Sequence, residues 1–160
     1  LFGYTHSAVF WYQESDNILS FIMPDHPDSL PIKFKLEASR SVIAEAAIEN
    51  NILCSLNSND QNPNQAPLSV VDQQILHLLE AEGLICIPIQ HNNTLFCVLT
   101  VGCNQELDRH SSQAKLLHYF ADEIALACQE TLTHINASEN KTSQGLLFNK
   151  SLISWTIGVF

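Results

Sequence analysis

The sequence predicts an α+β domain in which an antiparallel β-sheet carries helices on both of its faces. Three observations lead to this prediction. Apolar runs lie on both sides of short polar turns, segments with helical spacing separate these runs, and the longest pair of runs is apolar on both sides. A sheet with two apolar faces must be covered on both. With 160 residues, the chain is long enough for one such domain.

The first elements are a hairpin and a helix. Segment 7–23 has aromatic and β-branched residues on both sides of a polar loop at 14–17, which is typical of two antiparallel strands. After a proline-rich connection, segment 39–51 changes to helical spacing, with Ser39 or Ser41 as its N-cap. We therefore predict a helix directly after the first hairpin.

A short strand and a second helix follow. The apolar run at 52–56 is consistent with a strand, and segment 68–83 has an apolar stripe at helical spacing. Ser69 and Asp72 have the spacing of a capping box, and we expect Gly83 to terminate the helix.

A second hairpin is predicted over residues 82–102, with its turn at 92–93. The register set by this turn would place Cys86 and Cys97 on one face as diagonal neighbours, away from His91. We therefore interpret both cysteines as buried residues of the sheet and not as parts of a thiol–histidine site.

A long helix is predicted from Ser111 or Ser112 to Ile135, followed by a polar linker and an unassigned apolar end at 136–160. The sensor-like domain would then span residues 1–135. The apolar residues expected on the inner face of this helix are Leu117, Phe120, Ile124, Ala127 and Leu132.

Composition excludes several classes of function. Seven Lys and Arg against seventeen Asp and Glu give a net charge of −10, which would repel nucleic-acid phosphates and anionic lipids. Five cysteines are an odd number with no C-x-x-C pair, which indicates reduced thiols in a cytoplasmic protein and not a disulfide framework.

Catalytic and metal-binding motifs are also missing from the sequence. There is no G-x-G-x-x-G, P-loop or G-x-S-x-G sequence, so we expect no enzyme activity. His118 with Asp122, and Glu130 with His134, have i,i+4 spacing, but two separate pairs do not make a three-ligand metal site.

The order hairpin, helix, short strand, helix, hairpin, long helix resembles a GAF domain of the three-layer GAF/PAS-like type. The resemblance is carried by "SAVFWYQESDNILSFI", "SRSVIAEAAIENN", "EGLICIPIQHNNTLFCVLTVG" and "LLHYFADEIALACQETL". The sequence of these segments is similar to that of GAF modules in bacterial signalling proteins with HDOD or histidine-kinase domains. The N-terminal helix usual in that family has no counterpart in this chain.

The resemblance implies a regulatory sensor module in a larger protein. Such a module binds a small ligand or a partner domain on one side of its sheet. It forms homodimers through its terminal helices and relays its state to an output domain of the same protein. The cyclic-nucleotide motif and the bilin-carrying cysteine of some relatives are missing, so the ligand and any cofactor stay unknown. If a ligand is bound, we expect Phe10, Tyr12 and Phe96 to line its pocket.

Two alternatives remain open at the level of sequence. The chain could be a structural dimerisation module with a filled core and no ligand. It could also be a thiol-redox sensor, similar to GAF-like methionine-sulfoxide reductases. In that case Cys54, before an Asn-rich loop, and Cys103, after the last strand, are the expected reactive thiols.

Overall fold

The computed structural model describes residues 6–22, 32–37, 40–56, 68–108 and 110–157, with side chains to residue 134. The elements follow in the order β1 (Ser7–Gln13), β2 (Ile18–Ile22), β3 (Lys33–Lys35), α1 (Val42–Glu49), β4 (Leu53–Leu56), α2 (Val70–Leu78), β5 (Gly83–His91), β6 (Thr94–Cys103) and α3 (Ser112–Ile157).

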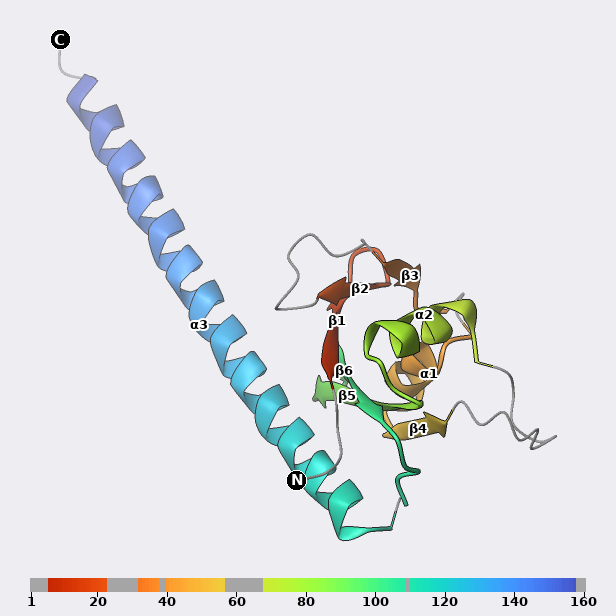
Figure 1. Ribbon diagram of the computed structural model, residues 1–160. Coiled ribbons are helices and arrows are strands. Elements are labelled where there is room, and N and C mark those ends of the chain that lie inside the picture. Colours follow the sequence, from red (N-terminus) through yellow and green to blue (C-terminus); the bar gives the residue numbers. More distant parts are fainter. Residues whose placement is uncertain (1–5, 23–31, 38–39, 57–67, 109, 158–160) are drawn as a thin grey trace. The chain divides into compact units, whose positions relative to one another are not determined.

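The six strands form one antiparallel sheet in the order β3-β2-β1-β6-β5-β4. Helices α1 and α2 lie against one face of this sheet, and the first turns of α3 lie on its other side (Figure 1). The predicted fold class, an antiparallel sheet with helices on both faces, is confirmed. Residues 1–125 and residues 126–160 form two separate compact units, so α3 contributes its first turns to the sheet-containing unit.

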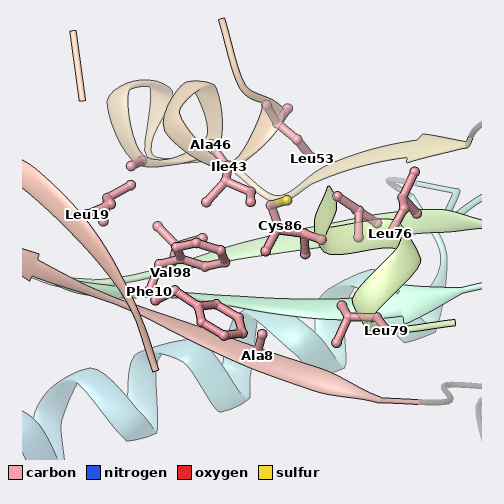
Figure 2. Close-up of a cluster of buried hydrophobic side chains, with 14 residues drawn as sticks. Ala8, Phe10, Leu19, Ile43, Ala46, Leu53, Leu76, Leu79, Cys86 and Val98 are labelled. Atoms are coloured by element: carbon pink, nitrogen blue, oxygen red, sulfur yellow. The ribbon is translucent and has the colours of Figure 1, made fainter. Parts of the chain in front are cut away.

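The sheet face under α1 and α2, which we call the helical face, carries the main core. Phe10 is fully buried there, and its ring lies 5.4 Å from that of Phe21 and 5.7 Å from that of Phe34, both tilted. Figure 2 shows Phe10 on the side of the sheet that faces Ile43 and Ala46 of α1. The other buried members of this core are Ala8, Leu19, Ala47, Leu53, Ile75, Leu76, Leu79, Leu84, Cys86 and Val98.

The opposite face, which we call the α3 face, is buried as well. It carries Ile85, Ile87, Val101 and Cys103, which alternate along β5 and β6 with the residues of the helical face. Both faces of β5 carry apolar residues because both faces of the sheet are covered, and the sequence predicted this covering.

The prediction of which side of α3 faces the sheet is wrong. Phe120 is 51% exposed and Ile124 is 42% exposed, whereas Ala114, Ala121 and Ala125 are buried. The helix presents its alanines because small side chains let a helix backbone approach its neighbour closely. Apolarity alone pointed to the larger residues.

A β-bulge changes the predicted register of the second hairpin. The pairing runs from His91 opposite Thr94 to Gln90 opposite Leu95, and then skips Phe96, so that Ile89 lies opposite Cys97. Phe96 is the extra residue, and every partner beyond it is shifted by one position.

This shift places Cys86 and Cys97 on opposite faces, which corrects the prediction that they share one. Cys86 lies opposite Thr100 on the helical face, and Cys97 lies opposite Ile89 on the α3 face. A one-residue slip in register moves a side chain to the other face of a sheet. The turn itself is as predicted, with Asn92 and Asn93 both at positive φ.

Two helix ends differ from the predictions. Helix α2 ends at Leu78 and is followed by Glu80 at positive φ, while Gly83 is the first residue of β5 instead of the helix terminator. Helix α3 continues to Ile157, past the linker predicted after Ile135. The linker residues include no proline, and Asn and Ser lower helix propensity without forbidding a helix.

Candidate functional site

A buried carboxylate joins the N-termini of α1 and α2. Asp72 is completely buried and is the N3 residue of α2, where it forms the predicted capping box with Ser69. Its Oδ2 accepts hydrogen bonds from Ser69 Oγ at 2.7 Å, from the Ser69 amide at 3.2 Å and from the Val42 amide at 3.1 Å. Its Oδ1 accepts from Ser41 Oγ at 2.5 Å.

Ser41 is the N-cap of α1 and accepts a hydrogen bond from the Ile43 amide at 3.1 Å. One carboxylate therefore caps two helices, and its charge is favourable at both positive helix ends. The sequence predicted each cap separately, but not that Asp72 serves both. Since the two helices meet only through the fold, no local spacing reveals this contact.

The three aromatic residues proposed to line a pocket are not gathered at one place. Phe10 and Tyr12 both lie on the helical face, where Phe10 is part of the packed core and the Tyr12 hydroxyl donates to Asn17 Oδ1 at 3.0 Å. Phe96 is buried at the bulge and is not a member of that core.

A cavity of about 480 Å³ lies at the β4 edge of the sheet, between that strand and the connection from β6 to α3. It is lined by Cys54, Glu106, Leu107, Asp108 and His110. All of them are ionisable except Leu107. The cavity thus combines a thiol, two carboxyl groups and an imidazole at a partly exposed position.

The two thiols suspected from the sequence are brought together. Cys54 on β4 and Cys103 at the end of β6 form a side-chain hydrogen bond, and this bond, burial and the charge of Cys54 raise the pKa of Cys103. The amide of Leu107 also donates to Cys54 Sγ at 3.4 Å. Cys54 is the partner at the cavity, and Cys103 is buried behind it.

Gly83 makes room for Cys103. It lies between Leu56 and Cys103 in register, and a Cβ at this position would be 3.1 Å from Cys103 Sγ, 2.4 Å from Leu56 Cδ2 and 2.9 Å from the carbonyl oxygen of Ser55. Only glycine fits this position without a shift of its neighbours.

The two i,i+4 pairs noted in the sequence lie on the surface of α3. His118, Asp122, Glu130 and His134 are exposed on α3. Across the residues that the structure describes, no group of three or more His, Cys, Asp or Glu side chains is placed to hold a metal ion. In the same part of the chain, no helix is both long and apolar enough to cross a membrane.

Solved structures with a similar fold are mostly GAF domains. The GAF domain of a two-component sensor histidine kinase from Bacillus halodurans is 18% identical, with a TM-score of 0.59 over 80% of this chain and 83% of that chain. Residues 122 to 287 of a methyl-accepting chemotaxis protein are 16% identical, with a TM-score of 0.58 over 80% of this chain and 79% of that one.

One similar structure is an enzyme. The type II free methionine-R-sulfoxide reductase from Thermoplasma acidophilum is 13% identical, with a TM-score of 0.51 over 80% of both chains. No family model matches the sequence, and a comparison with curated proteins finds no match. The chain has the GAF fold, and its function has to be argued from its own residues.

Proposed function

We propose that this chain is the sensor module of a multidomain signalling protein in the cytoplasm. It binds a small ligand or a partner domain and relays its state through α3 to an output domain. The observation that carries the proposal is the fold, which it shares with domains from a sensor histidine kinase and a chemotaxis protein. The proposed role is regulatory and includes no catalytic step.

The connection between sheet and helix supports a relay. Residues 104–111 join the end of β6 to α3, and the Leu107 amide ties this connection to Cys54 on the edge strand. Ser111 caps α3, since its Oγ accepts from the Ala114 amide at 3.1 Å. A change at the β4 edge can therefore reach the first turn of α3 through two hydrogen-bonded links.

A ligand would act by binding one arrangement of this connection more tightly than another. Coupling of this kind is typically about 1 to 3 kcal/mol, and it acts in both directions. The same reasoning holds for a partner domain.

The exposed side of α3 supports a homodimer as part of this proposal. Leu116, Phe120 and Ile124 are apolar and more than one-third exposed, and they follow one another at four-residue spacing. A second copy of the chain could cover this stripe through its own α3, which would place two relay helices side by side.

Native mass spectrometry of the purified chain tests the ligand part of the proposal, followed by thermal-shift measurements with a metabolite panel. We expect a retained or stabilising small molecule that also changes hydrogen exchange in residues 104–116. A chain that retains no molecule, shows no shift and dimerises through α3 would support the structural dimerisation module instead. Unchanged exchange in residues 104–116 on ligand binding would contradict the relay.

A further inference from the structure

Cys54 differs from an ordinary strand cysteine in its hydrogen bonds. Its sulfur accepts from the Leu107 amide at 3.4 Å and is hydrogen-bonded to Cys103. Hydrogen bonds donated to a sulfur stabilise its thiolate form, which is the nucleophile in thiol chemistry. Burial disfavours the charged form of a thiol, so the buried Cys103 keeps its proton and is taken as the donor, and the half-buried Cys54 is taken as the acceptor.

The cavity gives a reagent access to this sulfur. Its volume of about 480 Å³ is that of a small-molecule site, and Cys54 is part of its lining. Glu106 and Asp108 place two carboxyl groups at the same cavity, and both residues are exposed. These charges repel anionic reagents, and solvent screening limits their effect on the thiolate.

The sheet prevents the two thiols from closing a disulfide in place. Cys54 is on β4 and Cys103 is on β6, and both of these strands pair with β5, which lies between them. Two strand spacings separate their backbones by roughly 9 to 10 Å. A disulfide requires Cα atoms within about 7 Å, so Cys103 can donate to Cys54 but cannot bond to it without movement of a strand.

We propose that Cys54 is a peroxide-reactive thiol, that Cys103 and the Leu107 amide activate it, and that its product is a sulfenic acid. The Cys54 thiolate attacks one oxygen of hydrogen peroxide, a small uncharged oxidant, so an S–O bond forms and the O–O bond breaks. Sulfur loses two electrons and the peroxide gains them. The leaving hydroxide takes the proton that the thiol released, and the net products are Cys54 sulfenic acid and water.

This inference is independent of the proposed ligand and goes beyond the relay. Oxidation replaces the negative charge on the sulfur with a neutral S–OH group, which weakens the hydrogen bond from the Leu107 amide, and it adds an oxygen atom in the cavity. The connection from β6 to α3 is then released from β4. Oxidation of Cys54 would thus act on the same segment as a bound ligand.

The test treats the whole chain with a small excess of hydrogen peroxide in the presence of dimedone, which traps sulfenic acids, and locates the label by peptide mass spectrometry. We expect label on Cys54 about tenfold faster than on Cys128, the partly exposed thiol of α3, because hydrogen bonds donated to a sulfur favour its thiolate form. Label that appears first on Cys128, or equally on both residues, overturns the proposal.

Matched variants test the role of Cys103. Cys103→Ala removes the donor and should slow the labelling of Cys54 at least fivefold, whereas Cys103→Ser keeps a hydroxyl donor and should remain within about twofold of the parent. Cys97→Ser, on the same face but away from the cavity, is the control and should leave the rate unchanged. Equal rates in the Ala and Ser variants, or a Cys54–Cys103 disulfide in the native protein, overturn the assignment of Cys103 as a donor.

The charge of the reagent tests the cavity without a change at either cysteine. Uncharged iodoacetamide should alkylate Cys54 faster than anionic iodoacetate, by a larger factor than at Cys128. Combining Glu106→Gln with Asp108→Asn should reduce that factor. The same preference at Cys54 and Cys128 would show that the cavity carboxylates do not select the reagent, and would contradict an uncharged oxidant.

Discussion

Cys86 and Cys54 lie on neighbouring strands and yet have opposite environments. Cys86 is paired with Leu53, the residue before Cys54, and it is fully buried on the helical face. Burial raises the pKa of its thiol, and the negative charge of Asp72 raises it further. Cys54 points to the α3 face, lines a cavity and accepts a hydrogen bond from the Leu107 amide.

The comparison shows that the pleat decides what a cysteine in this sheet can do. Successive residues of a strand point to opposite faces, so a step of one residue separates an inert core thiol from an accessible one. On the helical face, the hydrogen bonds of Asp72 join the N-termini of α1 and α2. On the α3 face, Gly83 and the cavity leave space at the edge of the sheet. Each of the following predictions tests one side of this difference.

The largest effect is expected at Asp72. Asp72→Asn replaces one acceptor oxygen with an NH₂ group and leaves donors of the two helix ends without a partner in a buried site. We expect a loss of roughly 3 to 4 kcal/mol in the free energy of unfolding. Urea denaturation measures it, with Glu49→Gln, an exposed carboxylate of α1, as the control near zero. A loss under about 1 kcal/mol would mean that the hydrogen bonds of Asp72 do not hold the N-termini of α1 and α2 together.

Gly83→Ala tests the space that the missing side chain of Gly83 leaves on the α3 face. The added Cβ would meet the Ser55 carbonyl oxygen at 2.9 Å and Cys103 Sγ at 3.1 Å, so we expect a loss of about 2 kcal/mol. The displaced Cys103 should also slow the labelling of Cys54. Glu82→Ala, the exposed neighbouring position, serves as control for both readouts. An alanine variant as stable and as reactive as the parent would refute the role assigned to Gly83.

The covering of the α3 face can be tested on the helix itself. Ala125 is fully buried, and Ala125→Leu should overpack its surroundings and cost about 2 kcal/mol of stability. Phe120 is 51% exposed, so Phe120→Ser should change the stability of the monomer by less than about 0.5 kcal/mol. Thermal unfolding at low protein concentration compares the two variants. A larger loss of stability in Phe120→Ser than in Ala125→Leu would support the inner face expected from the sequence instead.

A smaller effect is expected from the titration of Cys86. Its pKa in the folded chain lies above the ordinary value of 9.0, so the unfolded chain loses this proton first as the pH rises. Stability should therefore be fully present below pH 9 and fall above it, by at most about 1.4 kcal/mol per pH unit for this thiol.

Urea denaturation at pH 8 and pH 10 measures this change. Cys86→Val removes the titrating group with a similar volume and should flatten the slope, whereas Cys128→Val should not. Cys103, whose pKa is also raised, contributes a slope of the same sign that remains in both variants. An identical slope of stability against pH in the parent and in Cys86→Val would show that Cys86 does not contribute to this pH dependence.

Local elements could be predicted from the sequence because short-range chemistry decides them. The caps at Ser41 and Ser69, the turn at Asn92 and Asn93, and the alternation of apolar residues all depend on neighbours a few positions away. The short strand β3 was missed, since three residues after a proline-rich segment are too few to show a period.

By itself, the sequence determined five of the six strands described, the two capped helices and the need to cover both faces of the sheet, and it singled out Cys54 and Cys103 as thiols near chain connections. Only the tertiary structure decided which side chains share a face, because a single bulge at Phe96 shifts the register of β6. It also decided that Asp72 caps two helices and that Cys103 lies beside Cys54. Those contacts join residues about 30 to 50 positions apart, and no local pattern encodes such a distance.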